Sequence, residues 1–162
     1  MRAQAEEVEH IQSDVVVARL QSLEQRIERT GEMFQQLIKA QGKPIRLDYS
    51  PGTRYMYLVR QRDKKENTIG AYWRVFVLGA DKRRIWKKGW HPKRIPPVVL
   101  KKMDSENYEI FSWINEIAKA IYTARTDLVK KKQRVLGTLQ SVGRSDDPRM
   151  QKAEELLDEF VL

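Results

Sequence analysis

The spacing of apolar residues changes twice along this chain, from a heptad pattern to alternation and back again. From Val16 to Leu37 one stripe of residues recurs at intervals of four and three, and the same intervals return from Ile110 to Val135. A heptad repeat predicts a helix that packs along another helix, whereas alternation predicts a strand with one buried face. The sequence therefore predicts two long helices separated by a β region.

Both heptad stripes can be traced residue by residue. The first consists of Val16, Leu20, Leu23, Ile27, Thr30, Phe34 and Leu37. The second consists of Ile110, Ile114, Ile117, Ile121, Ala124, Leu128, Lys131 and Val135. Asp104 or Ser105 is placed to cap the second helix. The stripes predict either an antiparallel pair within one chain or, through the 16–37 stripe, a homodimer or a contact with a protein partner.

Three segments between the helices show strand patterns. Arg54–Arg60 and Ala71–Leu78 are rich in aromatic and β-branched residues, and Lys82–Gly89 follows a tight turn. Their short connections predict a three-stranded antiparallel sheet. We therefore expect an α+β protein, with this sheet inserted between the two helices and a short helix at the C-terminus. The expected parts of this single structural unit are a helix over 1–40, a β region over 41–104, a helix over 105–142, and a linker with the short helix over 143–162.

Positive charge is concentrated in the β region. The whole chain of 162 residues has a formal net charge of +9. Residues 41–104 alone hold 17 Lys or Arg against five Asp or Glu, a net charge of +12, so the flanking segments are slightly acidic. A concentrated basic block is typical of a surface that binds a polyanion.

Composition argues against several classes of protein. The chain has no cysteine, which excludes disulfides, thiolate metal sites and thiol catalysis. It has no apolar run of about 18 residues, so we expect no membrane segment and a cytoplasmic or nucleoid-associated protein. Of its two histidines, His10 lies in an acidic helix, where we expect a solvated side chain, and His91 has no local carboxylate to orient its ring. No phosphate-binding loop is present. We expect no catalytic residue, no metal and no cofactor.

The third predicted strand combines basic residues with a tryptophan. Alternation puts Lys82, Arg84, Trp86 and Lys88 on one face and points Ile85 toward the core. Lysine and arginine neutralise phosphates, and an aromatic ring stacks on a base. The candidate nucleic-acid contacts are Arg74, Lys82, Arg83, Arg84, Trp86, Lys87, Lys88, His91, Lys93 and Arg94, extended by Lys130, Lys131 and Lys132.

The stretch from Ile69 to Val77, the turn at Asp81, and the basic strand from Lys82 to Trp90 resemble a known class of domain. They are similar to the N-terminal DNA-binding domains of phage and mobile-element integrases, which, like the plant AP2 type, read DNA with a three-stranded sheet backed by one helix. The resemblance covers about a fifth of the chain. It implies that Arg74, Lys82, Arg84, Trp86 and Lys88 face DNA, and that Gly89-Trp90 closes onto the helix.

Taken together, these features predict a non-catalytic DNA-binding protein with an accessory or regulatory role, of the kind found in a mobile element, phage or plasmid. Two alternatives stay open. The sheet can serve an RNA-binding protein or ribonucleoprotein component instead. The heptad helices can serve a protein–protein adaptor, whose basic hairpin docks on an acidic partner.

Overall fold

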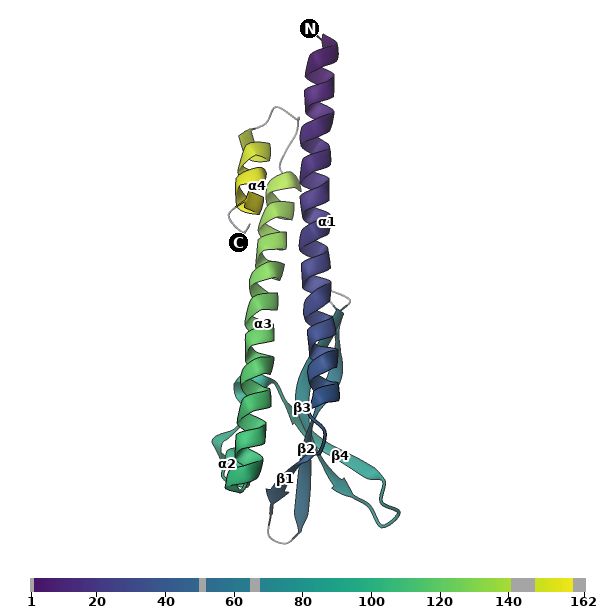
Figure 1. Cartoon of the computed structure of the whole chain (residues 1–162), viewed down its shortest axis with the longest axis vertical. Coiled ribbons are helices and arrows are strands. Elements are labelled where there is room, and N and C mark those ends of the chain that lie inside the picture. The colour runs from purple at the N-terminus through teal and green to yellow at the C-terminus, as the bar shows by residue number, and fades with distance from the viewer. Residues whose placement is uncertain (1, 50–51, 65–67, 141–147, 159–162) are drawn as a thin grey trace. The chain divides into compact units, whose positions relative to one another are not determined.

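The computed structural model describes residues 2–49, 52–64, 68–140 and 148–158 and has an α+β architecture (Figure 1). Helix α1 spans Arg2–Ala40 and helix α3 spans Ser105–Gln140. Between them lie four strands, a short 3₁₀ helix η1 (Pro92–Arg94) and the one-turn helix α2 (Pro97–Leu100). Helix α4 (Pro148–Asp158) follows. Among the described residues, no helix is both long and apolar enough to cross a membrane.

The chain divides into two compact units. Residues 1–28 and 125–162 form the first, called here the helical unit, and residues 29–124 form the second, the sheet unit. Helices α1 and α3 each contribute to both units. The predicted linker begins at residue 143, and its residues 143–147 lie outside the described part of the chain.

The sheet is antiparallel with the order β1-β2-β3-β4, where the sequence predicted only three strands. Strands β2 (Thr53–Asp63), β3 (Thr68–Leu78) and β4 (Arg84–Trp90) correspond to the predicted ones. The additional strand β1 (Ile45–Asp48) has only four residues, of which Ile45 and Leu47 are buried. One alternating pair of apolar residues is too short a signal to predict a strand.

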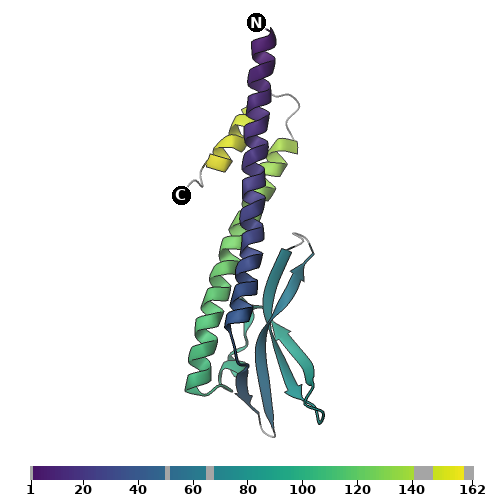
Figure 2. The same cartoon turned by 45° about the vertical axis from the view of Figure 1, so that its right-hand side comes forward.

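The buried core of the sheet unit lies between the sheet and parts of α1 and α3. Figure 2 shows the parts of both helices that belong to the sheet unit on one side of the sheet, and this side is called the inner face. Apolar residues from the strands and helices form one buried cluster there. Its members are Phe34, Leu37, Ile45, Leu47, Met56, Leu58, Ala71, Trp73, Val75, Val99, Phe111, Ile114, Ala118 and Ile121.

Three polar side chains form hydrogen bonds from the helices, or from their ends, to the backbone of a strand or to the buried Trp73 side chain. Gln41, at the end of α1, accepts from the Leu58 N–H at 2.8 Å and donates to the Leu58 carbonyl at 2.6 Å. The Tyr122 hydroxyl bonds both the N–H and the carbonyl of Ala71. Asn115 accepts from Trp73 Nε1 at 2.9 Å and donates to the Pro92 carbonyl at 3.2 Å. Each contact pairs a buried polar group that would otherwise lower stability.

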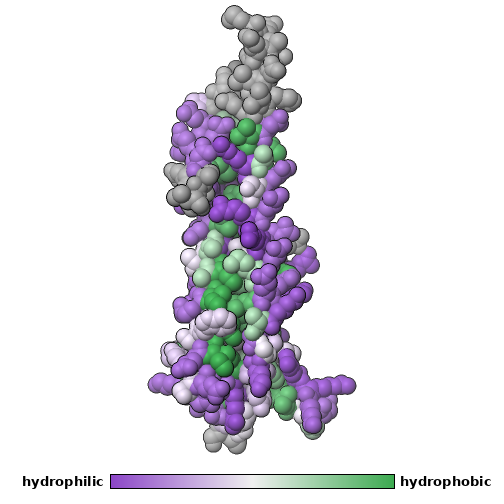
Figure 3. Space-filling model, in the orientation of Figure 1, coloured by the Kyte–Doolittle hydropathy of each residue, from purple (hydrophilic) through white to green (hydrophobic). Residues whose placement is uncertain are grey.

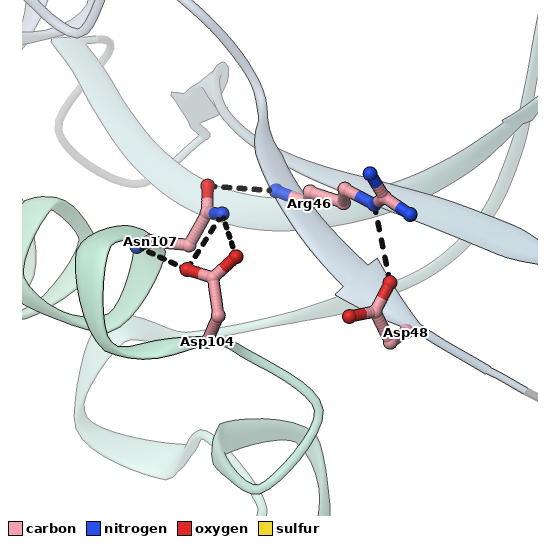
Figure 4. A network of polar contacts seen from close by, with 4 residues as sticks. All are labelled: Arg46, Asp48, Asp104 and Asn107. Atoms are coloured by element: carbon pink, nitrogen blue, oxygen red, sulfur yellow. Dashed lines mark hydrogen bonds and ion pairs between the residues drawn. The ribbon is translucent and has the colours of Figure 1, made fainter.

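The start of α3 is fixed by the predicted cap, as Figure 4 shows. Asp104 accepts from the backbone N–H of Asn107 at 2.8 Å, and this bond together with those from the Asn107 side chain lowers the pKa of Asp104. Asn107 in turn accepts from the backbone N–H of Arg46 at 3.2 Å. The helix cap therefore also satisfies one donor of the edge strand β1.

The helical unit contains its own small core. Val16, Leu23, Val135, Ala153 and Leu157 are buried together, so α1, α3 and α4 all contribute. In both units the predicted stripe of α1 is buried within the chain, apart from Leu20, which is partly buried. This burial leaves little apolar surface on the 16–37 stripe for a second copy, and dimerisation stays a prediction.

The stripe of α3 is shifted by one residue at three of its eight predicted positions. Ile114, Ile121 and Val135 are buried as expected, whereas Ile110 is 41% exposed and Phe111 is buried in its place. Ala118 and Arg125 are likewise buried instead of their predicted neighbours Ile117 and Ala124. The prediction followed isoleucine, but the helix turns the larger ring of Phe111 toward Trp73, with ring centroids 5.1 Å apart.

Candidate nucleic-acid interface

The face of the sheet opposite the core, called here the outer face, carries aromatic residues and arginines. Strand register aligns Tyr55 of β2, Phe76 of β3 and Trp86 of β4 in one row, and it pairs Tyr57 with Arg74. These residues alternate with the buried residues of the same strands and therefore point away from the helices. The row therefore crosses β2, β3 and β4, whose alignment with one another the sequence did not predict.

The aromatic rings of the outer face contact one another. The rings of Tyr55 and Phe76 are stacked at 5.5 Å between centroids, and Phe76 meets Trp86 edge to face at 5.1 Å. Phe76 is only 2% exposed although it lies opposite the core, because its neighbours cover it. Tyr55, Tyr57 and Trp86 are half-buried. Such rings offer stacking surfaces to an incoming planar group.

Two arginines lie over these rings. The guanidinium of Arg74 is 5.2 Å from the Trp86 ring centroid, and that of Arg84 is 4.9 Å from Phe76 and 5.2 Å from Tyr57. Neither arginine pairs with a carboxylate in the described part of the chain. Their charge therefore stays available for a ligand while the rings hold each guanidinium in place.

A β-bulge divides the basic residues of β4 between two faces. Arg74 pairs with Gly89 and Phe76 pairs with Trp86, so Lys87 and Lys88 together lie opposite the single residue Val75. Both lysines line a pocket with inner-facing Val75 and Trp90. The prediction that Lys88 shares a face with Arg84 and Trp86 is therefore wrong, because the extra residue changes the alternation.

Ile85 was predicted to point to the core and does not reach it. It pairs with Val77 near the end of the β3–β4 hairpin, beyond the buried cluster, and is 47% exposed. Leu78 on the same hairpin is 51% exposed. Figure 3 shows hydrophilic side chains around this end of the hairpin, with a small hydrophobic patch beside them.

Lys82 and Arg83, the next two candidate contacts, lie in the β3–β4 hairpin turn and are exposed. Lys82 adopts a positive φ of 61°, and its N–H donates to the Gly79 carbonyl at 2.9 Å. Arg83 is paired with Asp81 at 3.2 Å, yet its side chain is 87% exposed. Strand β4 begins at Arg84, so Lys82 belongs to the turn and not to the strand face as predicted.

His91 caps the short helix η1. Its Nδ1 accepts from the Lys93 N–H at 3.2 Å, and its ring lies 4.2 Å from that of Tyr122. Burial, followed by the positive charges of Lys93 and Arg94, lowers the pKa of His91 and favours the neutral ring. Lys93 and Arg94 themselves are exposed.

The predicted extension at Lys130–Lys132 belongs to the helical unit, and two of its three lysines serve the fold. Lys131 is buried, with Nζ 3.4 Å from the Leu157 carbonyl. Lys132 Nζ lies 3.3 Å from Glu24 Oε1. Lys130 is exposed. Lys131 and Lys132 therefore stabilise helix packing, as the heptad position of Lys131 already indicated.

The described residues contain no group of three or more side chains suited to hold a metal ion. Comparison with protein-family models, curated proteins and solved structures finds no match to this chain. Function must therefore be argued from the surface itself.

The sequence analysis did not propose Tyr55, Tyr57 and Phe76 as candidate site residues. Their alternation along β2 and β3 was the signal that could have found them.

Proposed function

We propose that this is a non-catalytic nucleic-acid-binding protein of accessory or regulatory role, and that DNA lies on the outer face of its sheet. The observation that carries the proposal is the position of Arg74 and Arg84. Both lie over aromatic rings on a face turned away from the helices, and neither pairs with a carboxylate among the described residues.

This combination suits the two parts of a nucleotide. A guanidinium that lies over a ring can still donate its N–H groups to phosphate oxygens. The half-buried rings of Tyr55, Tyr57 and Trp86 are available to stack on unpaired bases. Unpaired bases are accessible only in a single strand, so the outer face favours single-stranded over duplex DNA.

Further cations lie on the β3–β4 hairpin and on the segment that follows β4. Lys82, Arg83, Lys93 and Arg94 are exposed, and they supply phosphate contacts beyond those of the two outer-face arginines. If about six cations contact phosphates, affinity falls by about 10³-fold between about 50 and 200 mM salt. Affinity that changes little with salt would contradict an electrostatic interface.

The test compares variants of Arg84 by fluorescence anisotropy with a labelled single-stranded DNA. Arg84→Ala removes both charge and stacking, and we expect affinity to fall about tenfold, equivalent to about 1.4 kcal/mol. Arg84→Lys keeps the charge but not the planar contact with Phe76 and Tyr57, so its loss should be smaller. Arg26→Ala removes an exposed arginine from α1 and is the matched control, which should bind as the wild type does.

Competition at fixed salt among single-stranded DNA, duplex DNA and RNA identifies the preferred ligand. Tighter binding of RNA would support the ribonucleoprotein alternative. If Arg84→Ala binds every nucleic acid as well as wild type while circular dichroism shows an intact fold, the outer face is not the interface. An adaptor function, with the helices as the working surface, would then be the better account.

A further inference from the structure

A pocket lies on the inner side of the sheet at the edge formed by β4. Its volume is about 510 Å³, within the range of small-molecule sites. Apolar and aromatic side chains form most of its lining, and three cations complete it. The lining consists of Tyr49, Arg54, Val75, Lys87, Lys88, Trp90, Pro96, Val98 and Val99.

The charged groups of this pocket are all positive. Arg54, Lys87 and Lys88 form no ion pair with any carboxylate that the structure describes. The guanidinium of Arg54 instead lies 4.4 Å from the Tyr49 ring centroid, which holds it at the pocket wall. Three cations beside an apolar surface match a ligand with an anionic group on a flat, largely apolar body.

The β-bulge connects this pocket to the outer face. Trp86 belongs to the outer-face row, and the next two residues, Lys87 and Lys88, line the pocket on the other side of the same strand. Strand β4 is the last in the sheet order, so its free edge separates the two surfaces. A strand of nucleic acid that crosses the outer face and passes this edge therefore arrives at the pocket.

We infer that the pocket holds the phosphorylated terminal nucleotide of a single DNA strand. The terminal phosphate lies among Lys87, Lys88 and Arg54, and the base and sugar lie against the apolar lining. A phosphomonoester carries a charge of about −1.5 to −2, compared with −1 for a phosphodiester within the strand. Three unpaired cations discriminate in favour of the more highly charged end. The inference rests on the proposed function, since the rest of the strand occupies the outer face.

The experiment uses single strands of about 12 nucleotides, labelled internally, that carry a 5′-phosphate, a 3′-phosphate or hydroxyl groups at both ends. Binding is measured by anisotropy at one ionic strength with the full-length protein. We expect one of the phosphorylated strands to bind about tenfold more tightly than the hydroxyl-ended strand. Equal binding of all three strands would overturn the terminal-nucleotide assignment and leave the proposed function standing.

Two variants test whether the preference arises in the pocket. Lys87→Ala/Lys88→Ala removes two exposed cations, and Val98→Phe fills the pocket mouth without changing charge, because Val98 is 60% exposed there. Both should abolish the preference for a phosphorylated end. Lys39→Ala/Lys119→Ala removes the same charge from helices α1 and α3 and should retain the preference. A preference that survives Val98→Phe would refute insertion into the pocket.

Failure of the proposed function gives a different result. If the wild type binds none of the strands, the outer-face proposal is refuted, and calorimetry with a deoxynucleoside monophosphate then tests the pocket alone. Binding that Val98→Phe abolishes would support an anion-binding nucleotide pocket, and absence of binding would overturn it. Where the strands do bind, the same calorimetry compares the monophosphate with the phosphorylated strand. Equal affinity of the two would identify the free nucleotide, and not the strand end, as the ligand.

Discussion

Gly89 lies where the ring of Tyr72 crosses strand β4, and adding one methyl group there should destabilise the sheet unit. A Cβ at position 89 would lie 2.4 Å from Tyr72 Cε2, 2.9 Å from Cδ2 and 3.0 Å from the Trp73 carbonyl oxygen. Carbon atoms in good contact are about 3.5–4.0 Å apart, so the Tyr72 ring has to move by about 1 Å. Overpacking of this kind costs about 1–3 kcal/mol, and we expect Gly89→Ala to lower the free energy of unfolding by that amount.

A double-mutant cycle isolates the ring as the cause. In a Tyr72→Ala background the closest clash is absent, and only the contact with the Trp73 carbonyl remains. Replacing glycine by alanine also restricts the unfolded chain, which stabilises by about 0.4–1 kcal/mol. The cost of Gly89→Ala should therefore fall to about zero in that background, with a coupling energy of about 1–3 kcal/mol.

The assay is urea unfolding followed by tryptophan fluorescence. All four tryptophans lie within residues 29–124, so fluorescence reports on the sheet unit alone. Free energies are compared for wild type, Gly89→Ala, Tyr72→Ala and the double variant. A cost of Gly89→Ala that is equal within about 0.5 kcal/mol in both backgrounds would refute the ring contact and assign the cost to backbone.

Two further predictions concern polar groups that support the site. Asn115→Leu leaves the buried Trp73 Nε1–H without its partner, so urea unfolding should show a loss of about 1–3 kcal/mol, and an unchanged stability would contradict this. Because the pKa of His91 is lowered on folding, the unfolded chain binds more protons, and stability should fall as pH drops from about 7.5 to 5.5. His91→Asn keeps a capping acceptor for the Lys93 N–H and should reduce that pH dependence, whereas an unchanged slope would assign it to other groups.

Periodicity predicted the helices of this protein well because they are long. Seven positions repeat at these intervals from Val16 to Leu37; six of them are buried and Leu20 is partly buried. In α3, however, Ile110 and Phe111 are both large and apolar, and spacing alone does not choose between them. The choice depends on Trp73, which is distant in the chain and whose ring Phe111 contacts. Tertiary packing therefore decided what local pattern left ambiguous.

The candidate site was harder to predict than the fold, since a single residue changes which face a side chain occupies. Alternation placed Arg84 and Trp86 correctly on one face of β4, but it could not anticipate the two-for-one pairing opposite Val75. His91 and Lys131 were included for their charge. Burial and backbone hydrogen bonds assign them instead to a helix cap and to helix packing.

The dense basic segment from Lys82 to Arg94 therefore divides into parts that differ in chemistry. Arg84 lies over aromatic rings, where a planar cation combines with stacking. Lys87 and Lys88 line an apolar pocket, where compact point charges match a concentrated anion. The remaining exposed residues are placed to contribute charge with little geometric constraint. If this division is correct, Arg84→Lys should weaken binding at the outer face although the charge is kept, because the contact with Phe76 and Tyr57 is lost.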